Sequence, residues 1–189
     1  MRAFLIFVSI VMFQTVTLDS AVAGSVFVYE KPKVAHVGKE ATPLEAYDLI
    51  QKDAGRMFIV DVRTQAEYQF VGHPVGAVLV PFQFMGPKFT GKEYEMVENT
   101  NFTKDILARF NPKTDTLFFL CRSGTRAAVA VNTIVEGGWP ADKAYVILGG
   151  FEGEKMKDKN SAFDGQRVGG GWRNEGLPWS YSLDEKLIY

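Results

Sequence analysis

Cysteine and histidine are scarce in this chain of 189 residues, which contains one cysteine, Cys121, and two histidines. A single cysteine excludes an intramolecular disulfide, and one cysteine with two distant histidines does not supply the usual ligands of a zinc site. We therefore expect neither a metal nor a separate cofactor. The lone thiol is then either a buried packing residue or a reactive group.

A strong excess of charge and a membrane-length apolar run are also missing. The formal net charge is -1, and no basic block is long enough to follow a phosphate backbone, so nucleic acid is not an expected partner. The apolar stretch at residues 3–13 is interrupted by Ser9 and is followed by the polar residue Gln14. It is shorter than the roughly 20 residues that a membrane-spanning helix needs.

The N-terminus has the order of a secretory signal. Met1-Arg2 gives a positive start, the apolar stretch follows, and the small residues Ala21 and Ala23 precede Gly24. Cleavage after Ala23 would remove residues 1–23 and leave no stable membrane insertion. The expected location is the bacterial periplasm, because a mitochondrial address would be rich in arginine. Secretion, or tethering by an uncleaved signal, is the alternative.

Alternating strand-like and helical segments predict an α/β domain, with a central, mainly parallel sheet flanked by helices on both faces. Nearly apolar strands are predicted at residues 57–62, 76–81, 116–120 and 144–148. Helices are predicted from Thr42 to Gly55 and at residues 64–70, 102–110 and 127–135. The first helix is the best defined, because Thr42, Pro43 and Glu45 suit the cap, the first position and the capping box.

The other segments are expected to surround this sheet. The predicted divisions are an N-terminal arm at 24–40 with an extended piece at 26–29, the domain at 41–180 and a C-terminal tail at 181–189. Two stretches, at 83–101 and 152–171, interrupt the alternation and are interpreted as insertions. Trp172 and Trp179 either cover the core or form part of a docking surface for a protein partner.

Cys121 stands at the carboxyl end of a predicted buried strand, and a helix is predicted a few residues later. Open α/β sheets place ligand sites at this end. Backbone N–H groups of the intervening loop can point inward as an anion nest, and the helix N-terminus favours a thiolate. We therefore expect a reactive Cys121 and a substrate-binding loop made of Arg122, Ser123, Gly124, Thr125 and Arg126.

The run Cys-Arg-Ser-Gly-Thr-Arg at residues 121–126 resembles the active-site loop of rhodanese-domain sulfurtransferases. Further segments resemble this family in the same order: Asp61-Val62-Arg63 with Glu67, Gly72-His73-Pro74-Val75-Gly76-Ala77, Leu148-Gly149-Gly150, and Trp172 with Gly176-Leu177-Pro178. The resemblance covers about residues 40–180. The two insertions and Pro74 depart from the family pattern.

The resemblance implies a single-domain, exported sulfurtransferase that forms a persulfide on Cys121. The thiolate takes sulfur from a small anionic donor such as thiosulfate, and a thiophilic acceptor such as cyanide, a thiol or sulfite removes it. Mercaptopyruvate and a protein persulfide are alternative donors. Four residues are expected to support the site: Asp61 and Arg63 as an ion pair, with Glu67 and His73 nearby.

Two other functions are compatible with this loop. The chain could be a rhodanese-like sulfur carrier or protein-binding module that does not turn over. It could also be a cysteine phosphatase, whose loop likewise holds an anion above a thiolate. Phosphatase loops place the arginine six positions after the cysteine, whereas Arg126 comes at position five and Ala127 at position six. The shorter loop favours sulfur transfer.

Overall fold

The computed structural model describes residues 27–189. The predicted signal at 1–23 and the start of the predicted arm lie outside these described residues, so export stays a prediction. Within residues 27–189, no helix combines the length and the apolar character required to cross a membrane.

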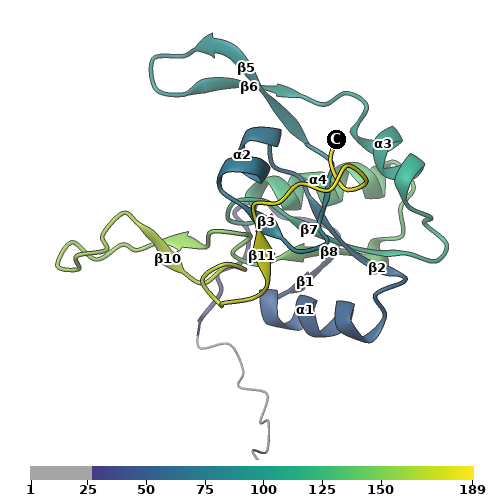
Figure 1. Cartoon of the computed structure of the whole chain (residues 1–189), viewed down its shortest axis with the longest axis horizontal. Coiled ribbons are helices and arrows are strands. Elements are labelled where there is room, and N and C mark those ends of the chain that lie inside the picture. The colour runs from purple at the N-terminus through teal and green to yellow at the C-terminus, as the bar shows by residue number, and fades with distance from the viewer. Residues whose placement is uncertain (1–26) are drawn as a thin grey trace, which may run out of the picture.

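A five-stranded sheet forms the centre of the domain (Figure 1). Its strands are β1 (Lys39–Ala41), β2 (Met57–Asp61), β4 (Val78–Leu79), β7 (Thr116–Leu120) and β8 (Ala144–Ile147). They lie in the order β1-β8-β7-β2-β4, and every neighbouring pair is parallel. The predicted α/β architecture is confirmed. Because β7 is the middle strand, the residue that follows it emerges between two neighbouring strands.

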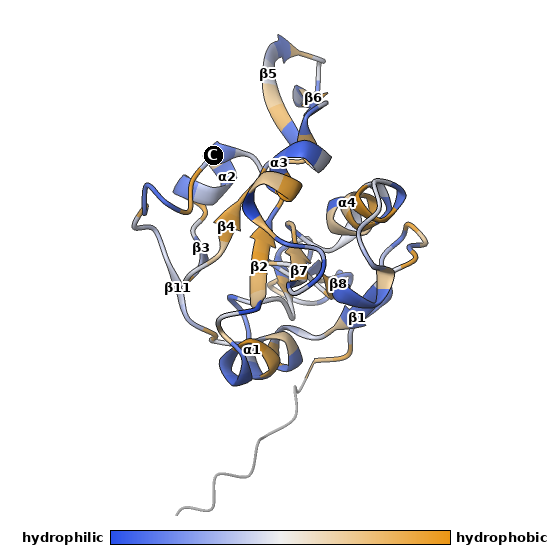
Figure 2. Ribbon diagram, turned by 90° about the vertical axis from the view of Figure 1, so that its right-hand side faces the viewer, coloured by the Kyte–Doolittle hydropathy of each residue, from blue (hydrophilic) through white to orange (hydrophobic). Residues whose placement is uncertain are grey.

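Helices cover both faces of the sheet, as predicted (Figure 2). On one face, α1 (Pro43–Lys52) and α2 (Gln65–Phe70) pack through Ala46 and Tyr68 against apolar strand residues. On the other, α3 (Phe102–Arg109) and α4 (Thr125–Glu136) pack through side chains such as Ile106 and Val131. Burial on both sides explains why the central strands are apolar throughout.

Local capping determines where the helices start. Thr42 and Glu45 form the predicted capping box of α1, and Thr64 and Glu67 form a second one at α2. The expected end of α1 at Gly55 is wrong, because the helix is already capped at Asp53. Helix α4 starts at Thr125, two residues before the predicted position, and this brings the helix N-terminus closer to Cys121.

The two predicted insertions each contain a pair of antiparallel strands. Residues 83–101 carry β5 (Gln83–Phe89) and β6 (Tyr94–Glu98), a hairpin that projects from the body above α2 (Figure 1). Residues 152–171 carry β9 (Glu154–Lys155) and β10 (Arg167–Gly169). The strand predicted at 76–81 is shorter than expected, because the edge strand β4 pairs with β2 at only two positions before the chain turns toward the hairpin.

Both ends of the described chain are attached to the domain. Residues 39–41, divided between the predicted arm and domain, are strand β1, whereas 27–29 form no strand. The Tyr29 hydroxyl donates to Glu175 and accepts from the Gly171 N–H. In the predicted tail, the Leu187 carbonyl accepts from the Leu79 N–H at 2.7 Å.

Trp172 lies inside the core rather than on a docking surface. It is 1% exposed and packs edge-on against Tyr47, and its indole N–H donates to the Pro178 carbonyl at 2.9 Å. Trp179 pairs within β11 (Trp179–Ser180) against β3 (His73–Pro74). The segment that follows β10 therefore closes one side of the domain.

Replacing Trp172 by alanine should strongly destabilise the protein. The change removes a buried ring and a hydrogen bond, and we expect a loss of about 3–5 kcal/mol in the free energy of unfolding. Urea denaturation followed by circular dichroism measures this loss. Phe163→Ala is the control, because Phe163 is exposed and its removal should change stability by less than about 0.5 kcal/mol. Equal effects of the two changes would contradict this packing role.

Candidate active site

Cys121 directly follows β7 and lies at the start of α4. The residue is 2% exposed, and its Sγ accepts a hydrogen bond from the Gly124 N–H at 3.1 Å. Gly124 has a φ of +106° and immediately precedes Thr125, the first residue of α4. This positive φ is a conformation that glycine adopts without steric cost, and it turns the amide back toward sulfur. The sulfur therefore meets an amide donor and the positive end of a helix.

The backbone of the cysteine loop is hydrogen-bonded to the segment that follows β8. The Phe151 N–H donates to the Cys121 carbonyl at 2.8 Å, and the Glu152 N–H donates to the Arg122 carbonyl at 3.0 Å. These bonds continue the contact between β7 and β8 past the ends of the strands. They fix the backbone from which the loop amides project.

Gly150 is required by this close approach. A Cβ at this position would lie 2.4 Å from the Cys121 carbonyl oxygen and 2.8 Å from the Ser123 nitrogen. Gly150 also has a φ of +57°. Both its backbone conformation and its lack of a side chain therefore allow the chain after β8 to reach the loop.

Asp61 and Arg63 form the predicted ion pair, and both side chains are completely buried. Arg63 donates to both Asp61 carboxylate oxygens and to the Gly72 carbonyl. Burial acts to lower the pKa of Arg63, but the charge and hydrogen bonds of Asp61 outweigh it and raise this pKa above its ordinary value. Because Asp61 lies opposite Leu120 in the sheet, the pair supports the strand end beside Cys121.

Glu67 has a partner that the sequence analysis did not assign. Arg126 donates to its two carboxylate oxygens at 2.8 and 2.6 Å. Burial alone would raise the pKa of Glu67, but the hydrogen bonds and charge of Arg126 lower it to about 2. Burial likewise acts against the charged form of Arg126, but Glu67, with a smaller effect of Cys121, raises the Arg126 pKa. Arg126 thus connects the start of α4 to α2 while remaining within electrostatic reach of the thiol.

The other predicted site residues lie around this centre with different partners. Arg122 is half-exposed and donates from its Nε to Glu152 at 3.1 Å. Ser123 and Thr125 are partly buried in the loop. The buried His73 ring stacks on Tyr68, with its Nδ1 3.0 Å from the Tyr68 carbonyl oxygen. His73 therefore packs against the end of α2, as a structural histidine does.

Three residues that hold the loop were not among the predicted site residues: Gly150, Phe151 and Glu152. The Gly149-Gly150 pair after the strand at 144–147 was a usable signal, since paired glycines often mark close backbone approach. Phe151 also packs beneath the Arg63 guanidinium, 4.4 Å from the ring centroid. Nothing in the local pattern around Phe151 or Glu152 indicated a contact with residues about 30 positions earlier in the chain.

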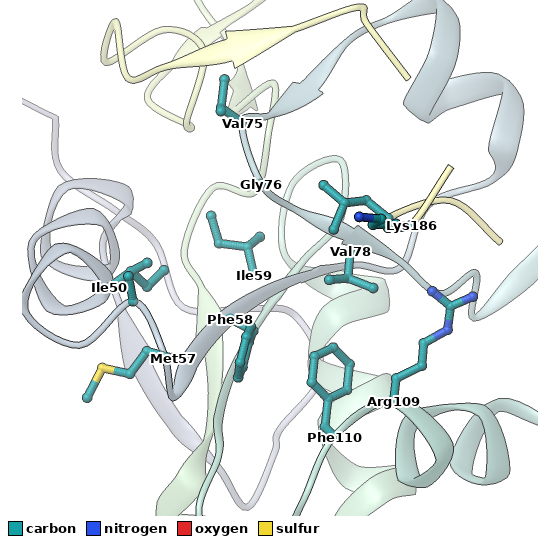
Figure 3. Close-up of a pocket in the computed structure, with 12 residues that line it drawn as sticks. Ile50, Met57, Phe58, Ile59, Val75, Gly76, Val78, Arg109, Phe110 and Lys186 are labelled. Carbon is teal, nitrogen blue, oxygen red and sulfur yellow. The ribbon is translucent and has the colours of Figure 1, made fainter. Parts of the chain in front are cut away.

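A separate pocket of about 490 Å³ lies at the start of β2, against Met57, Phe58 and Ile59 (Figure 3). Ile50, Phe58, Ile59 and Phe110 contribute apolar walls, and Arg109 lies at its rim. Its walls come from α1, β2, β4, the end of α3 and the C-terminal segment. This position is distinct from the loop at the carboxyl end of β7.

Comparison with known proteins identifies the domain. A family model described as the rhodanese-like domain matches residues 42–157, which include the whole loop at 121–126. The chain belongs to this family. The rhodanese-like chain is 36% identical over 125 residues to the uncharacterized protein RP600 of Rickettsia prowazekii, covering 66% of this chain and 83% of that protein.

A second relative and a solved structure agree with this assignment. The RP600 homolog of Rickettsia rickettsii is 34% identical over 139 residues, covering 72% of this chain and 93% of that protein. The crystal structure of Rv0390 from M. tuberculosis matches with a TM-score of 0.59 and 31% identity. The match covers 78% of this chain and all of Rv0390. The resemblance inferred from the motifs is thus confirmed at the level of family and fold.

Glu67→Gln should remove a stabilising effect that depends on pH. The pKa of Glu67 is lowered from 4.5 to about 2, so its ionised form stabilises the folded protein above pH 4.5. This contribution is lost as the pH falls through about 2. The difference in unfolding free energy between wild type and Glu67→Gln should therefore narrow from pH 5 to pH 2, as measured by urea denaturation. A difference that is constant over this range would contradict the proposed ion pair.

Gly150→Ala should be more harmful than an alanine at another glycine of positive φ. Gly76 is the matched control, because its φ is +78° and an added Cβ there meets nothing within 4 Å. Both changes strain the backbone, but only the first drives a methyl group into the cysteine loop. We expect Gly150→Ala to cost about 1–3 kcal/mol more than Gly76→Ala in urea denaturation. Similar losses would show that the loop has room to move away.

Proposed function

We propose that this rhodanese-like domain is a sulfurtransferase that carries sulfur as a persulfide on Cys121. The supporting observation is the position of Sγ, which accepts from the Gly124 N–H at 3.1 Å beside the N-terminus of α4. Amide donors and a helix N-terminus stabilise a negatively charged sulfur. They favour both the attacking thiolate and the anionic persulfide that follows it.

In the first half-reaction, the Cys121 thiolate attacks the outer sulfur of thiosulfate. A new S–S bond forms to Cys121, the S–S bond of thiosulfate breaks, and sulfite leaves with the bonding electron pair. In the second, cyanide or a thiolate attacks the outer persulfide sulfur, and Cys121 leaves as a thiolate. The intermediate divides one transfer into two displacements that need neither metal nor redox cofactor.

The loop arginines have different proposed roles. Arg126 is held by both oxygens of Glu67 and acts as a positioning residue that fixes the start of α4. Arg122 is half-exposed, and only its Nε is bonded to Glu152. Its remaining N–H groups can meet an anionic donor such as thiosulfate. Ser123 and Thr125 would contribute hydroxyl hydrogen bonds at the same loop.

The ion pair between Arg126 and Glu67 also argues against a phosphatase. Phosphoryl transfer at a cysteine loop needs a loop cation that holds the phosphoryl oxygens. Here both terminal nitrogens of Arg126 are directed to Glu67, and the loop is one residue shorter than the phosphatase pattern. Sulfur transfer makes a smaller demand, because a single sulfur atom has to be held.

Intact-mass analysis after incubation with thiosulfate tests the persulfide. We expect wild type to gain one sulfur atom, and cyanide to remove it with formation of thiocyanate. Cys121→Ser, which keeps a small polar side chain without a thiolate, should show neither the gain nor turnover. Absence of any sulfur gain in wild type would overturn the proposal.

Steady-state assays separate the enzyme from the alternatives. Repeated thiosulfate:cyanide turnover that depends on Cys121 supports the sulfurtransferase. A persulfide that forms but does not turn over with cyanide, thiols or sulfite would instead identify a sulfur carrier. Cys121-dependent hydrolysis of an aryl phosphate, without sulfur gain, would identify a phosphatase.

A further inference from the structure

A second pocket lies directly beside the cysteine loop, between α2 and the β5–β6 hairpin, and has a volume of about 550 Å³. We call it the hairpin pocket. Its walls include Phe70 of α2, the two loop arginines Arg122 and Arg126, and five residues of the hairpin: Gln83, Met85, Glu93, Tyr94 and Met96. The hairpin stands over α2 in Figure 1, and residues of both elements line the pocket.

The apolar side chains of this pocket are unusually exposed. Phe70, Met85, Tyr94 and Met96 are each at least 40% accessible to solvent although they are large. Met85 and Met96 are directly opposite each other in the hairpin, so they form a continuous apolar surface across both strands. Scattered apolar residues are normal on a protein surface, but a group of this kind around a concave site is typical of ligand binding.

Side chains along each hairpin strand alternate between two faces, and the apolar residues of the pocket lie on the same face. Gln83 and Met85 on β5, and Tyr94 and Met96 on β6, all line the pocket at every second position. Val97 pairs with Phe84 on the intervening positions. The alternation of side chains along the strands therefore decides which residues line the pocket. Val97, on the opposite face of the hairpin, can serve as a control position.

Apolar walls do not favour the binding of thiosulfate. It is a small, strongly hydrated dianion whose recognition requires charge and hydrogen bonds, which the loop amides and Arg122 supply. The acceptor is therefore the reactant that the walls suit. Because Cys121 is 2% exposed, only the reacting end of an acceptor enters the loop, and the rest of the molecule must lie outside it.

We propose that the hairpin pocket binds the sulfur acceptor, and that this acceptor is a low-molecular-mass thiol with an apolar body. The proposal rests on the sulfur-transfer function described above. Arg122, which lines the pocket and follows Cys121 directly, attracts the acceptor thiolate, and the Phe70, Met85, Tyr94 and Met96 side chains contact its apolar part. A pocket of about 550 Å³ is of the size that holds a small molecule.

The transfer step balances without another reactant. The acceptor sulfur forms a bond to the outer sulfur of the Cys121 persulfide, and the S–S bond to Cys121 breaks with its electron pair staying on Cys121. The acceptor gives up its thiol proton to solvent when it forms the thiolate, so the products are the acceptor persulfide anion and the Cys121 thiolate. Cys121 returns as the thiolate that accepts the next sulfur.

Two acceptors with the same reactive group test this inference. The persulfide form is prepared with thiosulfate and freed of donor, and its loss is followed by intact mass with 2-phenylethanethiol or 2-mercaptoethanol. We expect the apparent second-order rate constant to be about tenfold larger for 2-phenylethanethiol, because its ring is taken up by the apolar walls. Equal rate constants would overturn the proposal.

Variants on both walls of the pocket locate the preference. Met85→Thr/Met96→Thr keeps strand-forming residues in the hairpin, and Phe70→Gln changes the α2 wall without touching the hairpin. Each should reduce the ratio of the two rate constants toward one. Val97→Thr, on the opposite face of the hairpin, is the control and should keep the wild-type ratio. An unchanged ratio in Phe70→Gln and in a folded double variant would overturn the pocket assignment.

Failure of the acceptor proposal can be distinguished from failure of the proposed sulfurtransferase function. Sulfur gain from thiosulfate and its removal by cyanide in wild type test persulfide chemistry, whereas the ratio between the two thiols tests the hairpin pocket. If the variants instead alter only the rate of sulfur loading from the donor, the pocket serves the donor and the acceptor proposal fails. If sulfur passes to protein thiols but to neither small thiol, the acceptor is a macromolecule and the proposal of a low-molecular-mass acceptor fails.

Discussion

The backbone hydrogen bond from the Phe151 N–H to the Cys121 carbonyl holds the reactive loop against the segment that follows β8. This bond forms only because Gly150 has no side chain, since a Cβ there would lie 2.4 Å from the same carbonyl oxygen. Once the carbonyl is held on one side, the Gly124 amide turns toward Sγ on the other. The environment of the thiol is thus established by backbone groups, which require the parallel register of β7 and β8 to place them.

Three arginines close to this loop are each held by a carboxylate: Arg63 by Asp61, Arg126 by Glu67 and Arg122 by Glu152. The site is therefore less cationic than the sequence of the loop implies. In the proposed chemistry, amide groups and the start of α4 would stabilise the sulfur anion, whereas Arg63 and Arg126 hold the surrounding elements together. Of the three, Arg122 combines a carboxylate partner with substantial exposure, and we propose that it is the cation that meets the incoming anion.

The β5–β6 hairpin changes the surroundings of the loop without altering the loop itself. A two-stranded hairpin buries little of its own surface, so its apolar residues stay exposed unless another element or a ligand covers them. Here α2 supplies the opposing wall, and the cysteine loop supplies the floor. The chemistry of a common fold can therefore remain constant while a projecting segment decides which reactant is admitted.

The sequence was sufficient to predict the α/β class, the central strands, the capped start of α1 and the loop at residues 121–126, because these depend on local periodicity and on contiguous residues. It also indicated the Asp61–Arg63 pair, whose members are two positions apart. The folded structure was needed to show that Glu67 binds Arg126, that Gly150 lies against Cys121, and that residues 83–101 form a wall of a pocket. Contacts of this kind join residues far apart in the chain, and a charged or glycine residue has many possible partners until packing of the elements selects one.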